Sequence, residues 1–159
     1  MMTSAILIVL LAADAGLRLI PYPKEAQIAE GLFEMDRPLE ITAPSDNLWL
    51  IGTQLREECR TAGWPRPRLS GMQDKGASLR IAPPGAQAWP EPPLRENAAT
   101  EEYAIEIAAD AIVVQGKEPA GLFHGVQTLR QLIRANRAGS GLPLVSIRDW
   151  PCALQWRAF

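Results

Sequence analysis

The chain has 159 residues, a length that favours a single compact domain. Hydrophobic residues make up 47% and charged residues 21%, which is ordinary globular usage and argues against a disordered or collagen-like chain. The 16 Lys and Arg residues against 18 Asp and Glu residues give a net charge of -2, and the basic residues form no long cluster. Nucleic acid is therefore not an expected partner.

The first fifteen residues resemble a targeting segment. The apolar run from Ala5 to Ala12 is too short to span a bilayer. It is followed by Ala13-Asp14-Ala15, a small-x-small pattern of the kind that signal peptidases cleave. We therefore predict that residues 1–15 are a signal peptide, that the protein is exported to the periplasm or secreted, and that the chain has no membrane span. Because no Lys or Arg precedes the run, a buried first strand or a mis-assigned start codon stays open as an alternative.

The first half of the chain is predicted to form short strands and one helix. Alternating apolar residues and flanking prolines predict short extended segments at residues 17–24, 27–34, 38–42 and 78–82. Ser45 or Asp46 can cap a helix that ends at Gly63. Its predicted buried face, spaced every three or four positions, consists of Leu48, Ile51, Leu55, Cys59 and Ala62.

The second half is predicted to form a hairpin, a helix and a last strand. Residues 83–100 are proline-rich and are expected to form a surface excursion. Strands are predicted at residues 102–107, 112–114 and 144–147, the first two joined as an antiparallel hairpin. The helix begins at Glu118-Pro119 and ends between Asn136 and Gly141. Its predicted buried stripe consists of Leu122, Phe123, Val126, Leu129, Leu132 and Ile133, with Gln127, Arg130, Gln131 and Arg134 on the solvent side.

Together these elements favour an α+β fold in which a mostly antiparallel sheet carries helices packed on one face. The sequence holds no zinc-protease, nucleophile-elbow or phosphate-loop motif, so neither a catalytic residue nor a metal or cofactor is predicted. His124, the single histidine, is expected to have a packing or surface role. Glu101 and Glu102 point to opposite faces of a strand and are interpreted as a solvated strand edge.

The two cysteines are also interpreted as structural residues. Cys59 and Cys152 lie far apart in the sequence and form no CxxC pair, so they are expected to be buried small hydrophobes. Their disulfide status stays open. The five tryptophans could stack on sugars, but Trp49 is expected within the first helix and Trp64 and Trp89 border prolines. Trp150 and Trp156 are left as the tryptophans of interest.

A known family shows a similar order of segments. Residues 102–107 and 112–114 are followed by Ala-Gly-Leu-Phe-His-Gly-Val-Gln-Thr-Leu at residues 120–129. This order resembles the amino-terminal domain of bacterial-type family 20 glycoside hydrolases, the β-N-acetylhexosaminidases. The outer segments Ile20-Pro21-Tyr22-Pro23-Lys24 and Ile147-Arg148-Asp149-Trp150-Pro151 agree with the same family.

The resemblance implies a non-catalytic, zincin-like domain at residues 16–149. Residues 150–159 would then begin a truncated catalytic (β/α)8 barrel in cis, which removes terminal N-acetylhexosamine from glycans. In the family the catalytic Asp and Glu lie in that barrel, so this chain alone is predicted to be inactive. Because the chain stops at the apolar segment Trp156–Phe159, we expect it to be a fragment of a longer protein.

One site residue is carried over from the family. Arg157 in Trp156-Arg157-Ala158 occupies the place of an aromatic-Arg-Gly step whose arginine binds sugar hydroxyls, although Ala158 replaces the glycine. The alternative is a surface arginine without a role. Related domains also precede family 84 hexosaminidase, α-glucuronidase and α-N-acetylglucosaminidase barrels. A different class of function, a stand-alone carbohydrate- or protein-binding module with Trp89 as its anchor, also stays open.

Overall fold

The computed structural model describes residues 17–72, 78–86 and 91–150. In chain order its elements are β1 (Glu25–Glu34), β2 (Glu40–Pro44), α1 (Ser45–Thr61), β3 (Arg68–Met72), β4 (Ser78–Ala82), β5 (Tyr103–Ile107), β6 (Ile112–Gly116), α2 (Pro119–Ala135) and β7 (Gly141–Asp149). No helix in these ranges is long and apolar enough to cross a membrane.

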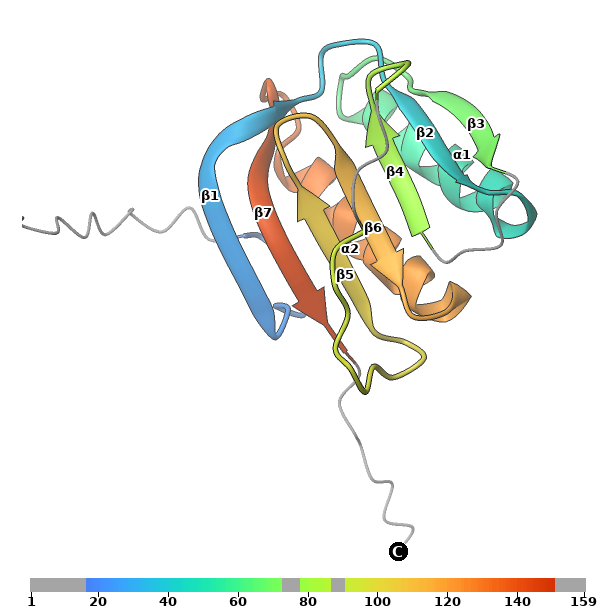
Figure 1. Ribbon diagram of the computed structural model, residues 1–159. Coiled ribbons are helices and arrows are strands. Elements are labelled where there is room, and N and C mark those ends of the chain that lie inside the picture. Colours follow the sequence, from blue (N-terminus) through green and yellow to red (C-terminus); the bar gives the residue numbers. More distant parts are fainter. Residues whose placement is uncertain (1–16, 73–77, 87–90, 151–159) are drawn as a thin grey trace, which may run out of the picture.

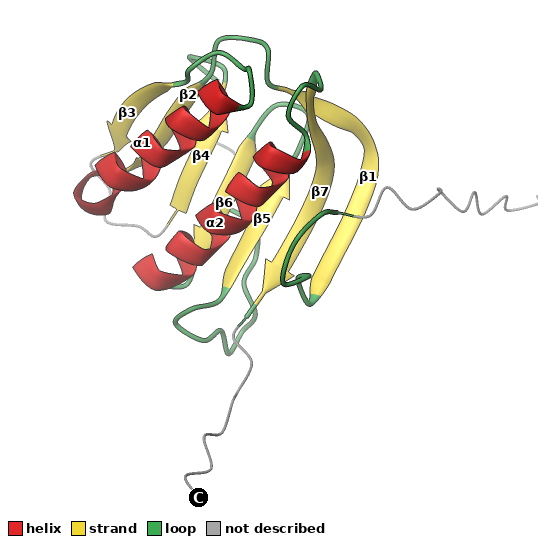
Figure 2. Cartoon of the chain, turned by 180° about the vertical axis from the view of Figure 1, so that it is seen from behind, coloured by secondary structure: helices red, strands yellow, loops and turns green. Residues whose placement is uncertain are grey.

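The described strands form one seven-stranded sheet in the order β1-β7-β5-β6-β4-β2-β3. Every neighbouring pair is antiparallel except β2 and β3, which are parallel. Both helices lie on one face of the sheet, behind it in Figure 1 and in front of it in Figure 2. The predicted α+β fold, a mostly antiparallel sheet with helices on one face, is therefore confirmed.

The predicted hairpin is also confirmed. Ile107 of β5 pairs with Ile112 of β6, and the turn between them is closed by a 2.9 Å hydrogen bond from the amide of Ala108 to the carbonyl oxygen of Ala111. Ile105 is fully buried, as the alternation predicts for one face of this strand.

One predicted strand is absent, and one observed strand was not predicted. Residues 17–24 form no strand, although Leu17 and Leu19 are buried in the core as their alternation suggests. The amide of Ile20 donates to the side-chain oxygen of Gln131 on α2, so this donor is used by a helix side chain and not by a strand. Conversely, β3 was not predicted, because a strand over residues 68–72 contains Ser70 and Gly71 and shows little alternation.

The helices bury the faces that their periodicity predicts. On α1, Leu55 and Cys59 are fully buried, and on α2 the same holds for Val126, Leu129 and Ile133. The prediction for Phe123 was wrong, since its side chain is 43% exposed. It sits on the flank of the stripe that runs from Leu122 through Val126, so the turn of the helix carries it away from the sheet.

A buried carboxylate joins the two helices. Glu58 of α1 is only 8% exposed, and it accepts hydrogen bonds from Arg130 Nε at 3.0 Å and from Arg134 Nε at 2.6 Å, both on α2. The prediction that Arg130 and Arg134 only cover the solvent side was therefore wrong. The bonds from Arg134 and Arg130 outweigh the effect of burial and hold the pKa of Glu58 below its ordinary value of 4.5.

We expect Glu58→Gln to lower the free energy of unfolding by about 1–3 kcal/mol, because it leaves two arginines facing a neutral group at a nearly buried position. Urea unfolding followed by circular dichroism measures this change. Glu57→Gln is the matched control: the neighbouring carboxylate also pairs with two arginines, Arg60 and Arg66, but it lies in solvent, where ion pairs contribute little. Equal losses in the two variants would contradict the assignment.

The same cluster predicts a dependence on pH. A carboxyl whose pKa is lowered by folding stabilises the protein above its unfolded pKa, and this stabilisation is lost as the pH falls through the lower folded pKa. We therefore expect the free energy of unfolding to decrease as the pH falls below 4.5, the ordinary pKa of Glu58. The decrease should be smaller in Glu58→Gln than in the unmodified chain, and an identical acid dependence of both proteins would show that Glu58 does not contribute.

Candidate functional site

Buried polar side chains gather at one end of the sheet, where β5 begins and β6 and β7 end. Tyr103, the first residue of β5, pairs with Gly116 at the end of β6 and with Asp149 at the end of β7. The first turn of α2 lies at the same end (Figure 2), as does the loop that precedes β5 (Figure 1). This end is also where the described chain leaves the sheet, at Trp150.

Glu102 is the most deeply buried charged group at this end. Its side chain is fully buried, and its two oxygens accept hydrogen bonds from the amide of Arg95 at 2.9 Å and from Arg95 Nε at 2.8 Å. The prediction of a solvated edge was therefore wrong for Glu102, whereas Glu101 is exposed as expected. Glu102 lies just before the strand, and the loop from Arg95 folds back over it.

The ion pair settles the protonation of Glu102. Burial by itself raises the pKa of this carboxyl, but the hydrogen bonds from Arg95 outweigh burial and place the pKa below its ordinary value of 4.5. Glu102 is therefore ionised at neutral pH. A carboxylate that is buried and already paired does not donate a proton to a substrate, so its role is structural.

A second buried contact links three elements. The hydroxyl of Tyr103 on β5 lies 2.7 Å from Oγ1 of Thr128 on α2, and it also donates to Oδ2 of Asp149 on β7 over 3.4 Å. Burial, together with the nearby Asp149, raises the pKa of Tyr103 to about 12, so the hydroxyl stays neutral. Sequence reasoning missed this contact; a threonine placed just outside the apolar stripe of α2 was the only signal for it.

Two glycines bring α2 close enough for these contacts. A Cβ at Gly121 would lie 2.2 Å from the carbonyl oxygen of Glu102, and one at Gly125 would lie 2.6 Å from Cγ1 of Val114 on β6. Both distances are shorter than any real contact of a methyl carbon. Gly121 and Gly125 thus set the distance between the helix and the sheet.

We expect Gly121→Ala to destabilise the fold by about 1–3 kcal/mol, because the new methyl group meets backbone atoms that cannot rotate away. Whether Gly121→Ala lowers or raises the free energy of unfolding shows whether the helix touches the backbone here. In a helix without such a neighbour, replacing glycine by alanine stabilises by about 0.8–1.0 kcal/mol. Thermal and urea unfolding measure the difference, and a stabilised Gly121→Ala protein would show that the helix does not approach Glu102 this closely.

The described histidine and the described cysteine lie in different surroundings. His124 is exposed on α2, with its ring 5.9 Å from that of Phe123 in an edge-on arrangement. Cys59 is fully buried in the core, as predicted, and burial raises the pKa of its thiol to about 12. Within the part of the chain that the structure describes, no three His, Cys, Asp or Glu residues are grouped to hold a metal ion.

We expect the thiol of Cys59 to be unreactive in the folded protein, because the thiolate is the reactive form and burial also blocks access. A Cys152→Ser variant leaves Cys59 as the single cysteine, and labelling with Ellman's reagent can be followed in buffer and in denaturing urea. The folded protein should react only at the rate at which it unfolds. Fast labelling in buffer, at a rate typical of free thiols, would contradict the burial of this side chain.

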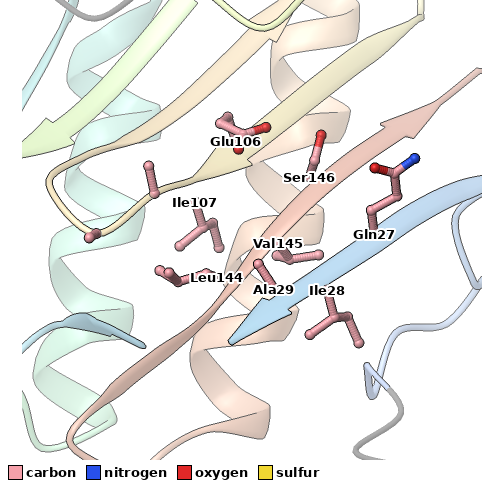
Figure 3. Close-up of a pocket in the computed structure, with 10 residues that line it drawn as sticks. Gln27, Ile28, Ala29, Glu106, Ile107, Leu144, Val145 and Ser146 are labelled. Carbon is pink, nitrogen blue, oxygen red and sulfur yellow. The ribbon is translucent and has the colours of Figure 1, made fainter. Parts of the chain in front are cut away.

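The described structure also has a shallow hollow of about 400 Å³ that spans β1, β7 and β5 (Figure 3). Its polar groups, Gln27, Ser146 and Glu106, occupy paired positions on the three strands. The remaining lining is apolar and includes Ile28 and Leu144. Glu106 is its single carboxylate, whereas hydrolysis of a glycosidic bond commonly requires two groups that flank the bond. The hollow therefore supplies no catalytic pair.

Several residues that the sequence singled out lie outside the described residues. These are Arg157, the predicted substrate-binding residue, together with Trp89, Cys152 and Trp156. Trp150 is described, and it stands directly after the last residue of β7.

A family model agrees with this arrangement. The model described as glycosyl hydrolase family 20, domain 2, matches residues 16–150. The chain belongs to this family. The match begins one residue after the predicted signal peptide and ends at Trp150, so it covers every described element, and the resemblance seen in the sequence is confirmed.

Two relatives point the same way. A β-hexosaminidase of Porphyromonas gingivalis is 27% identical over 154 residues, which is 92% of this chain but only 18% of the relative. The crystal structure of a β-N-acetylhexosaminidase from Bacteroides fragilis superposes with a TM-score of 0.56 at 18% identity, over 84% of this chain and 25% of that one. The structural likeness shows the shared fold, and the chain spans only a small part of either relative.

Proposed function

We propose that this chain is the non-catalytic domain 2 of a β-N-acetylhexosaminidase that removes terminal N-acetylhexosamine from glycans. The observation that carries the proposal is the family match over residues 16–150, in a chain that corresponds to 18% of its β-hexosaminidase relative. Its partner in the proposal is a catalytic (β/α)8 barrel in cis, which begins at residues 150–159. Glycan is bound through that barrel.

The two buried carboxylates and the buried tyrosine hydroxyl support a non-catalytic role because each is already paired with other side chains of the fold. Glu58 binds Arg130 and Arg134, Glu102 binds Arg95, and the hydroxyl of Tyr103 is shared with Thr128. These contacts tie α1 to α2 and join the elements that meet at the end of the sheet where β7 ends. Export, with residues 1–15 as the signal peptide, remains part of the proposal.

We expect the 159-residue chain alone to release no nitrophenol from 4-nitrophenyl N-acetyl-β-D-glucosaminide above the buffer rate. In-frame translation of the DNA beyond Phe159 should reveal a barrel, and the whole protein should hydrolyse the same substrate. Hydrolysis by the homogeneous 159-residue chain would overturn the non-catalytic role. A stop codon after Phe159, together with binding to immobilised chitin oligosaccharides, would favour a stand-alone binding module instead.

The substrate-binding role of Arg157 is tested in the whole protein. We expect Arg157→Ala to lower kcat/KM by about 10- to 100-fold, the loss of a charge-assisted hydrogen bond of roughly 1.5–3 kcal/mol. Arg157→Lys keeps the charge and is the control for hydrogen-bond geometry. An unchanged kcat/KM in Arg157→Ala would make this residue an ordinary surface arginine.

A further inference from the structure

Two cations lie against the indole ring of Trp150. The guanidinium carbon of Arg95 is 3.9 Å from the ring centroid, and Nζ of Lys24 is 4.9 Å from it. Both distances are within the range in which the negative face of an aromatic ring attracts a cation, and tryptophan is the strongest of the aromatic partners. Nζ of Lys24 also donates a hydrogen bond to the backbone oxygen of Trp150.

The three residues come from segments that are far apart in the sequence. Lys24 immediately precedes β1, Arg95 lies in the loop before β5, and Trp150 follows β7. A fourth residue, Asp149, joins two of these segments, since its Oδ1 accepts a hydrogen bond from the amide of Trp150 at 2.9 Å and from that of Lys24 at 3.4 Å. The indole thus lies where three segments meet.

The buried carboxylate of Glu102 holds Arg95 in position against the ring. The amide and Nε of Arg95 both bind this carboxylate, and a further guanidinium nitrogen lies 2.7 Å from it. The carboxylate of Glu102 balances the charge of Arg95, and the carboxylate of Asp149 binds the backbone amide of Lys24. The indole is therefore surrounded by two cations and two anions.

We propose that Trp150 is an anchoring residue that fastens the end of β7 to the segment before β1 and to the loop before β5. Arg95 and Lys24 hold its ring, and Glu102 holds Arg95. We call Lys24, Arg95, Glu102, Asp149 and Trp150 the exit joint. It ties the segment before β1 and the loop before β5 to Asp149 and Trp150 at the end of β7. The proposal concerns the domain's own chain and stands whether or not the proposed enzymatic function is correct.

Trypsin tests the exit joint, because the protease must take the side chain of Lys24 or Arg95 into its own pocket to cleave after it. The experiment uses the 159-residue chain under native conditions, with the rate of each cleavage followed by mass spectrometry. In Trp150→Ala we expect cleavage after Lys24 and after Arg95 to rise about tenfold, because both cations lose the ring. Trp150→Phe keeps an aromatic face and should restore most of the protection.

Two controls separate loss of the joint from general unfolding. Cleavage after Arg130, within α2, reports unfolding of the whole domain and should stay unchanged in Trp150→Ala. Ile133→Val removes one methyl group from the core away from the joint and shows how all sites respond to a small global loss of stability. Glu102→Gln should raise cleavage after Arg95 while leaving Lys24 protected.

The proposal is overturned if Trp150→Ala leaves cleavage after Lys24 and Arg95 unchanged. It is also overturned if those rates rise only in proportion to cleavage after Arg130, as in Ile133→Val. Nuclear magnetic resonance gives a second measurement for variants that unfold too easily for proteolysis. The indole N–H signal of Trp150, identified by its loss in Trp150→Phe, should shift in Arg95→Met and in Lys24→Met, and an unshifted signal in both would equally reject the joint.

Discussion

The close approach of α2 to the sheet is the constraint on which the rest of the structure depends. With no side chain at Gly121 and Gly125, the helix lies directly against the backbone of Glu102 and the side chain of Val114. This places Thr128 within hydrogen-bond distance of the Tyr103 hydroxyl. The stretch from Ala120 to Leu129, which carries the family resemblance, therefore has a physical meaning: it is the sequence that permits this packing.

Ion pairs explain why two carboxylates are tolerated inside the fold. A buried carboxylate is costly unless hydrogen bonds and a partner of opposite charge compensate for the loss of water. Glu58 meets this condition between the helices, and Glu102 meets it at the end of the sheet. The first pair joins α1 to α2, and the second joins the loop before β5 to the start of that strand. Apolar contacts have no direction, so these pairs favour one arrangement of the joined segments.

Local patterns predicted local structure well. The two long helices and the hairpin follow from apolar periodicity and end signals that lie within a few residues of each other, and the structure confirms them. The same holds for Cys59, whose spacing within the stripe of the first helix predicts its burial. By contrast, β3 is stabilised by pairing with β2, and the whole of α1 separates these two strands in the sequence. The five residues of β3 therefore carry little signal of their own.

The charged residues show the limit of such reasoning. Glu102 and Arg130 look like surface residues in a linear sequence, and only the fold reveals their partners. Arg130 meets Glu58 across 72 positions of the sequence, and no periodicity encodes that distance. The tryptophan that follows the last strand was singled out as interesting, but its contacts with Lys24 and Arg95 depend on the fold in the same way.

The strand order has a consequence for how the protein is made. Among the described strands, β1 comes first in the chain, and its one neighbour in the sheet is β7, which comes last. During synthesis β1 therefore emerges from the ribosome more than a hundred residues before its partner exists. It is then an unpaired strand, and Phe33, which is fully buried in the folded protein, lacks its cover. Such long-range pairing is slow to form and leaves the chain open to wrong partners in the meantime. The sheet can close at β1 only after β7 has been synthesised. Until then the nascent amino-terminal segment must be kept from pairing with other chains.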